Sequence, residues 1–131
     1  MIKDSFYDRG IAVRRDMFGP AGAEQMTDNA SAFTDELQDI VTRHCFGDIW
    51  SRDGLDRRDR SLVTLAMLVA LGRSHEIGIH TRGALANGVT SDELRELLIH
   101  SSLYCGIPSA FDGFRVVEPI VDEAAGKENV A

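Results

Sequence analysis

A glutamate and a histidine, Glu76 and His80, are the residues whose types and spacing most directly suggest chemistry. Side chains four residues apart leave the same face of an α-helix about one turn apart. A carboxylate in that place can orient the imidazole and support its charged form, so the pair could move protons near neutral pH. Because such pairs are also common on helix surfaces, a purely structural role is the alternative interpretation.

The same stretch can be compared with a metal site, since His75 and Glu76 precede His80 in the pattern H-E-x-x-x-H. The zinc-protease motif H-E-x-x-H is one residue shorter and places two histidines on one helix face. The extra residue puts His75 and His80 on poorly matched faces. We therefore expect no bound metal here.

Other polar and aromatic side chains are candidates for a pocket wall. His44 lies on an apolar stripe and His100 follows an apolar run, so each is by default a core histidine with a satisfied hydrogen bond. Of the two, His44 is the better candidate for lining a pocket, and Trp50 could cap a pocket or seal its loop. Three arginines lie at the start of an apolar helix, where the helix dipole disfavours cations. They are Arg57, Arg58 and Arg60. Structural ion pairs and the binding of a substrate carboxylate explain them equally well.

Length and charge limit the classes of function. The 131 residues suit a single domain, residues 1–131. With 14 Lys+Arg against 21 Asp+Glu, the net charge of −7 repels phosphate backbones and anionic lipids, so we expect neither nucleic acid nor a membrane as partner. The N-terminal residues resemble no export signal. Cys45 and Cys105 are too far apart for a C-x-x-C motif and are expected to be free thiols in a reducing cytoplasm.

Apolar spacing and end signals predict an all-α domain, a bundle of about six helices. A first helix is expected from Asp4 or Ser5 to Phe18 with a solvated face at residues 14–16, followed by a Gly/Ala-rich connector that completes an N-terminal part, residues 1–30. A second is expected from about Ser31, loosened at Gly47 and followed by a loop over residues 48–56.

Four further helices are expected in the second half of the chain. The first begins at the acidic cap around Asp56 and is apolar nearly all round over residues 62–71, so it must be covered by its own chain or by another subunit. The next begins near Ser74. A capping box, Thr90-Ser91-Asp92-Glu93, starts the third, and Pro108 suits the first turn of the last. In chain order, these four helices are expected to end at Gly72, at Asn87-Gly88, at Cys105-Gly106 and before a polar tail. The tail, residues 126–131, is expected to be flexible.

A series of short motifs along these elements is specific in its order and spacing. It consists of Gly54-Leu55-Asp56-Arg57-Arg58-x-Arg60-Ser61-Leu62, Ala70-Leu71-Gly72-Arg73, Glu76-x-x-x-His80-x-Arg82, Asn87-Gly88, Asp92-Glu93-Leu94-Arg95-Glu96 and Tyr104-x-Gly106-x-Pro108. The series resembles the 4-carboxymuconolactone decarboxylases, from about Tyr7 to Val121. Their wider all-α superfamily includes alkylhydroperoxidase-like proteins with a C-x-x-C-x-x-x-H site. The stretch Gly72 to Glu76 holds no cysteine, so peroxidase chemistry is not expected.

The resemblance implies a cytoplasmic enzyme of the protocatechuate branch of the β-ketoadipate pathway. Such an enzyme is a ring-like homo-oligomer, usually a hexamer, and works without metal or organic cofactor. It removes CO2 from 4-carboxymuconolactone and yields the β-ketoadipate enol-lactone. The electrons left by the departing carboxylate flow into the lactone carbonyl, so the protein must stabilise a dienolate and protonate one carbon. The resemblance implies that His80 donates this proton, or a hydrogen bond to the dienolate oxygen, and that Glu76 orients the ring.

The resemblance also implies roles for the residues around this pair. Arg60, together with Arg58 or Arg82, would hold the two carboxylates of the substrate, while Trp50 and His44 would line the pocket. Arg82 follows the histidine by two positions and faces nearly the opposite way on the helix, which suits a subunit interface or a structural role.

Two departures from the family pattern leave alternatives open. The chain reads Pro108-Ser109-Ala110-Phe111 where the decarboxylases continue Pro-Ala-Ala-Asn, and Ser74-His75 replaces an acidic pair. A decarboxylase or isomerase of a related lactone or keto acid is therefore one alternative. A catalytically idle, oligomeric binding protein with the same fold is the other.

Overall fold

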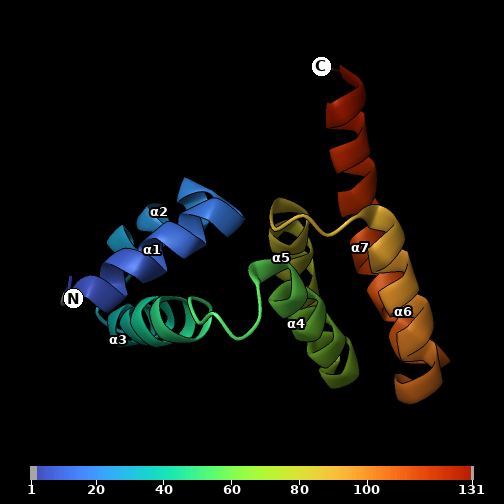
Figure 1. Ribbon diagram of the computed structural model, residues 1–131, viewed down its shortest axis with the longest axis horizontal. Coiled ribbons are helices and arrows are strands. Elements are labelled where there is room, and N and C mark those ends of the chain that lie inside the picture. The colour runs from blue at the N-terminus through green and yellow to red at the C-terminus, as the bar shows by residue number, and fades with distance from the viewer. Residues whose placement is uncertain (1–2, 131) are drawn as a thin grey trace. The chain divides into compact units, whose positions relative to one another are not determined.

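A computed structural model describes residues 3–130, which are almost entirely helical (Figure 1). These described residues contain seven α-helices, a short 3-10 helix, a π-helix and no strand. The all-α prediction is confirmed, with one helix more than the approximate six. The helices form two compact units that divide between Arg57 and Arg58. The expectation of a single domain stays a prediction.

Unit 1 is built on its first helix, α1, which was predicted correctly. The Asp4 side chain accepts a hydrogen bond from the backbone N–H of Tyr7 at 2.9 Å and so caps the helix start, and Gly19 ends the helix with a positive φ of 72°. The elements of unit 1 are α1 (Ser5–Phe18), η1 (Pro20–Gly22), α2 (Glu24–Asp28), α3 (Asp35–Ile40) and the π-helix η2 (Val41–Ile49).

Two glycines let α1 and η2 cross in close contact. A Cβ atom on Gly10 would lie 1.8 Å from the carbonyl oxygen of Thr42, and one on Gly47 would lie 2.1 Å from that of Phe6. No side chain fits at either position without moving backbone. Gly47 was expected to loosen the end of a helix; instead it lies inside η2, at the crossing.

The predicted helix from Ser31 is wrong in its start and in its type. The α-helix begins at Asp35 and passes at Val41 into a π-helix, so the expected loop begins only after Ile49. A π-helix has i→i+5 hydrogen bonds and more residues per turn, so apolar residues spaced by three and four no longer share one face. His44, expected in the core, is exposed, as are Leu37 and Ile40 of the same stripe, because η2 packs against α1 through Thr42, Phe46 and Gly47 instead.

Arg14 was expected on a solvated face, but it is buried and only 3% exposed. Its Nε donates to the carbonyl oxygen of Gly22 at 2.9 Å, and its Nη1 donates to Gln38 Oε1 at 3.0 Å and to Thr42 Oγ1 at 2.9 Å. These bonds offset the cost of burying a cation, and burial lowers the pKa of the guanidinium. A side chain that joins α1 to η1, α3 and η2 cannot be solvated.

Unit 2 contains four long helices: α4 (Arg57–Leu71), α5 (Ser74–Ala86), α6 (Ser91–Cys105) and α7 (Ile107–Val130). In Figure 1, α4 and α6 run in one direction and α5 and α7 run in the other. The predicted capping box is confirmed, because Thr90 Oγ1 accepts from the N–H of Glu93 and Glu93 Oε1 accepts from the N–H of Thr90. The core packs around Leu65, Val69, Ile77, Leu94, Leu98 and Val117.

The last helix is longer than expected. It continues through Gly126 to Val130, so most of the predicted tail, residues 126–131, is helical, and residue 131 lies outside the described residues. Among the helices of the described residues, none combines the length and the apolar character that crossing a bilayer requires.

Candidate active site

Helix α5 positions the Glu76–His80 pair. Its buried side is anchored by Ile77 and Thr81, and the Thr81 hydroxyl donates to the carbonyl oxygen of Ile77 at 2.7 Å. Glu76 is exposed and His80 is half-buried. Burial lowers the pKa of His80 below its usual value of 6.5, and the nearby charge of Glu76 opposes that shift without cancelling it.

The lowered pKa defines what this imidazole can do before substrate binds. At neutral pH the His80 ring is neutral and has one N–H, which can donate a hydrogen bond to a developing oxyanion. To deliver a proton, the ring must first be protonated, and an anionic group bound beside it raises its pKa in that direction. The charge of Glu76 also raises the pKa of His80. The pair is therefore suited to an anionic substrate.

Arg58 and Arg82, both predicted to bind substrate, have carboxylate partners in their own chain. Arg58 forms ion pairs with Glu93 and, at 3.4 Å, with Asp59. Arg82 forms an exposed ion pair with Glu123 of α7 at 3.2 Å. A substrate carboxylate would have to replace these partners.

Arg60, the third of these arginines, lies at the same end of α4 as Arg58. It is half-buried near the start of α4, next to Ser61, whose hydroxyl accepts a hydrogen bond from the Asn87 side chain at 3.0 Å. This bond ties the start of α4 to the end of α5, the helix that carries the acid–base pair. The role of Arg60 in binding a substrate stays a prediction.

Trp50 and His44 belong to unit 1, and their roles as pocket residues stay predictions. Trp50 is buried and its ring lies 5.9 Å from that of Phe46, whereas the His44 side chain is exposed. Trp50 also lines a cavity of about 480 Å³ within unit 1, together with Arg9 and Arg52. Those two arginines were not singled out from the sequence, although Arg52 follows Trp50 by only two positions.

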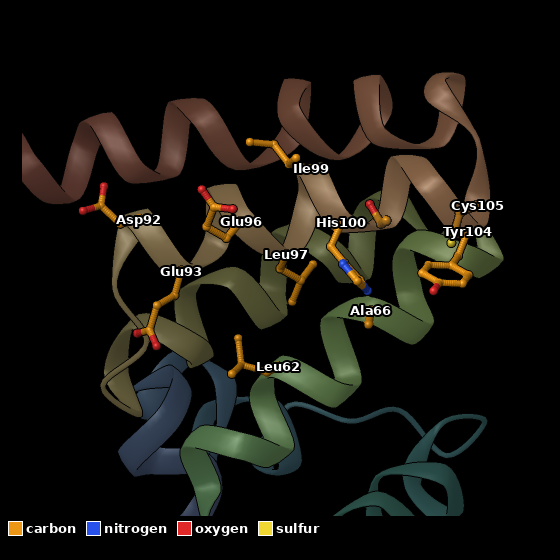
Figure 2. A pocket seen from close by; sticks show the side chains of 11 residues that line it. Leu62, Ala66, Asp92, Glu93, Glu96, Leu97, Ile99, His100, Tyr104 and Cys105 are labelled. Atoms are coloured by element: carbon orange, nitrogen blue, oxygen red, sulfur yellow. The ribbon is translucent and has the colours of Figure 1, made fainter.

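A cavity of about 670 Å³ in unit 2 lies between α4 and α6 and is lined by none of the predicted site residues (Figure 2). Leu62 and Ala66 of α4 line it together with Glu96 and His100 of α6, and the His100 ring points toward Ala66. His100 was expected in the core, but it is exposed. It lines this cavity. Glu96 and His100 repeat the four-residue spacing of the first pair, which the sequence analysis overlooked.

Among the described residues, no group of three or more His, Cys, Asp or Glu side chains is arranged to hold a metal ion. The described cysteines, Cys45 and Cys105, are free thiols.

Comparison with known proteins gives a direct match for residues 35–119, to the carboxymuconolactone decarboxylase family. The chain belongs to this family. The matched range contains the Glu76–His80 pair, all three arginines, Trp50 and His44.

Curated relatives of the family extend this similarity over most of the chain. A nitrosuccinic acid decarboxylase from Metarhizium robertsii is 40% identical over 121 residues, which are 92% of this chain and 85% of the relative. A 4-carboxymuconolactone decarboxylase from Acinetobacter baylyi is 40% identical over 120 residues, 92% of this chain and 90% of the relative. Both relatives are named decarboxylases, so family membership supports a carboxy-lyase. The names of the two relatives give different acids as the substrate.

Proposed function

We propose that this chain is a cofactor-independent decarboxylase of 4-carboxymuconolactone that yields the β-ketoadipate enol-lactone in protocatechuate breakdown. The similarity to the Acinetobacter relative over 92% of the chain supports this substrate. The observation that carries the proposal is the half-buried His80, one turn from the carboxylate of Glu76. Such an imidazole can supply the hydrogen bond to oxygen or the proton on carbon that this reaction requires of the protein.

The reaction leaves charge on oxygen before it needs a proton on carbon. When the C–C bond to the departing carboxylate breaks, its electron pair moves through the ring double bond into the lactone carbonyl. CO2 leaves, and the remaining dienolate carries negative charge on the former carbonyl oxygen. His80 donates a hydrogen bond to this oxygen or a proton to the ring carbon, and Glu76 keeps the imidazole oriented and supports its charged form.

The remaining candidate residues hold the substrate. Arg60 binds a carboxylate through its guanidinium, with Arg58 or Arg82 in support. These contacts are expected at the carboxylate that is retained, because a strong clamp on the departing group would hinder loss of CO2. Trp50 and His44 line the pocket.

A second candidate substrate is nitrosuccinate, favoured by the equal identity to the Metarhizium relative. Nitrosuccinate also has two carboxylates, one of them on the carbon that bears the nitro group. When this carboxylate leaves as CO2, the electron pair of the broken C–C bond moves onto the nitro oxygens and forms a nitronate. Protonation of the carbon then completes the reaction. Both substrates therefore ask the site to stabilise an oxygen-centred anion, protonate a carbon and retain one carboxylate.

The enzyme is proposed to act in a reducing cytoplasm and as a homo-oligomer, with a hexamer as the expected assembly. The free thiols of Cys45 and Cys105 agree with a reducing compartment. Exposed apolar side chains on α4, among them Met67 and Leu71, support association with further copies. Sedimentation of the purified protein measures the number of subunits.

The experiment uses purified protein treated with a chelator. It is mixed separately with 4-carboxymuconolactone and with nitrosuccinate, while CO2 release and ultraviolet absorbance are followed. We expect rapid CO2 release from the lactone, unaffected by the chelator. Faster release from nitrosuccinate would favour the second candidate.

Two other outcomes would contradict the proposed function. Release of CO2 only from other lactones or keto acids would show a different decarboxylase. No turnover of any of these acids by an intact oligomer would show a binding protein that has kept the fold.

A further inference from the structure

The cavity of about 480 Å³ in unit 1 is formed by α1 and by the chain that follows η2. Helix α1 contributes Arg9, Ala12 and Val13, and the remaining lining residues lie between positions 50 and 57. A volume of this size is within the range of small-molecule sites, which combine apolar walls with a few polar groups. The residues around it therefore indicate what kind of molecule it could bind.

Trp50 is the aromatic residue that lines this cavity, and its surroundings hold it in place. It is buried, and its ring lies 5.9 Å from that of Phe46 in η2. Its backbone N–H donates to the carbonyl oxygen of Cys45 at 2.9 Å, and the Ser51 hydroxyl donates to the carbonyl oxygen of Phe46 at 2.8 Å. A flat apolar group in the cavity would lie beside an indole whose position is already fixed.

Arg9 is the cation in this cavity whose contacts leave it best prepared to bind an anion. Its Nε donates to the carbonyl oxygen of Gly47 at 3.3 Å, and its guanidinium carbon lies 4.6 Å from the centre of the Phe6 ring. The two terminal nitrogens of Arg9 form no hydrogen bond or ion pair within the part of the chain that the structure describes. These two nitrogens match the spacing of the two oxygens of a carboxylate.

The charges that line the cavity favour a ligand with a single carboxylate inside it. There are three arginines and two aspartates, namely Arg9, Arg52, Arg57, Asp53 and Asp56. Arg57 is already ion-paired with Asp16 of α1 at 3.0 Å. An excess of arginines over acids is a local exception in a chain of net charge −7. A second carboxylate in the same space would be repelled by the two aspartates.

We propose that the cavity of unit 1 binds a small planar carboxylate, whose oxygens contact the terminal nitrogens of Arg9 and whose apolar part lies beside Trp50. Because Gly47 and Phe6 already orient the guanidinium, little side-chain freedom is lost on binding. Arg9 lies outside the residues 35–119 that match the family. The inference rests on the proposed function only for the identity of the natural ligand, since that function assigns Trp50 to the substrate pocket.

The test uses benzoate as the probe and the fluorescence of Trp50 as the signal, because the full chain has one tryptophan. Benzoate should change the fluorescence until the signal saturates, with a Kd of about 1 mM or below. Benzamide has the same ring and no charge, so it is the matched control ligand. It should bind at least about tenfold more weakly, because it lacks the charged contact with Arg9.

Variants of Arg9 test the charged contact directly. Arg9→Gln should raise the Kd for benzoate at least about tenfold. Arg9→Lys keeps the charge but lacks the paired N–H groups, so its Kd should lie between those of the wild type and Arg9→Gln. The matched control is Arg15→Gln, which removes an exposed arginine of the same helix that pairs with Glu24. It should bind benzoate like the wild type.

Ala12→Leu tests the cavity separately from the charge. Ala12 is half-buried on α1 and lines the cavity, so a leucine at this position would occupy part of its volume. The Kd for benzoate should rise at least about tenfold although Arg9 is retained. Far-UV circular dichroism checks that each variant is folded.

Three results would overturn the inference. They are a fluorescence change that does not saturate, equal Kd values for benzoate and benzamide, and binding by Arg9→Gln as tight as that by Arg15→Gln. The proposed function would survive these results if the wild type still released CO2 from 4-carboxymuconolactone. Saturable benzoate binding that requires Arg9, in a protein that releases no CO2, would support the inference and contradict the proposed function.

Discussion

Two turns of unit 2 carry the same pair of residues at the same spacing, yet the structure surrounds them differently. Glu76 and His80 lie on α5, where the imidazole is half-buried and its pKa is lowered by burial. Glu96 and His100 lie on α6, where both side chains are exposed along an open groove. A carboxylate one turn from an imidazole is therefore not sufficient for a catalytic assignment. Partial burial, which strengthens local electrostatics, distinguishes the first pair.

The comparison predicts its largest effect for removal of the buried ring. His80→Ala should lower kcat at least about 100-fold, the usual range for loss of a general acid or base, while sedimentation stays unchanged. The matched control is His75→Ala, an exposed histidine on the same helix, which should keep kcat within about twofold of the wild type. Full turnover by His80→Ala would place the chemistry elsewhere.

A second test asks whether an anionic substrate binds beside the first pair. Arg60→Ala should raise KM roughly 10- to 100-fold, because a hydrogen bond to a charged group contributes about 1.5–3 kcal/mol. Its kcat should change less. Arg115→Ala removes an exposed arginine that pairs with Asp112 on α7, and steady-state kinetics should show wild-type KM for it. If the two variants behave alike, Arg60 has no part in binding.

A third test removes the charge of the acid and keeps its shape. Glu76→Gln should lower the pKa of His80 further, because the charge that favours the imidazolium is gone. If His80 is the proton donor, kcat/KM should fall roughly 3- to 10-fold at neutral pH. NMR titration of the ring measures the pKa, and Glu118→Gln on α7 is the control. An increase in the pKa of His80 would contradict the assigned role of Glu76.

The fold of unit 2 could be predicted from sequence because its helix ends are encoded locally. Thr90 and Glu93 satisfy each other's backbone N–H groups, and Gly72 and Gly106 stop helices with positive φ, so a few neighbouring residues decide each boundary. The spacing of Glu76 and His80 on one helix followed from the same local geometry. What sequence could not supply was the burial that separates this pair from Glu96 and His100.

Unit 1 was predicted less well because long-range contacts shape it. Arg14 is buried only because partners up to 28 residues away, Gln38 and Thr42 among them, surround it. Gly10 and Gly47 permit a close crossing that no local pattern announces. Periodicity pointed to the wrong face, because Leu37, Ile40 and His44 of the predicted stripe are exposed and the chain packs against α1 through Thr42 and Phe46 instead.

The smallest expected effect concerns stability, and it follows from the sign of the His80 shift. Burial lowers the pKa of His80 in the folded protein, so the unfolded chain binds a proton at a higher pH than the folded one. Its contribution to stability is therefore complete above the unfolded value of 6.5 and is lost as pH falls through the folded pKa. Carboxylates such as Asp4, whose pKa Arg43 lowers to about 2, act only at more acidic pH.

Urea unfolding between neutral pH and about pH 5 isolates this effect, because that window covers the ordinary histidine range and lies above that of most carboxylates. The wild type should lose more unfolding free energy across the window than His80→Gln, whose side chain stays neutral throughout. Equal slopes would show that folding leaves the proton affinity of the ring unchanged. In that case burial would no longer distinguish His80 from His100, and the choice between the two pairs would depend on turnover alone.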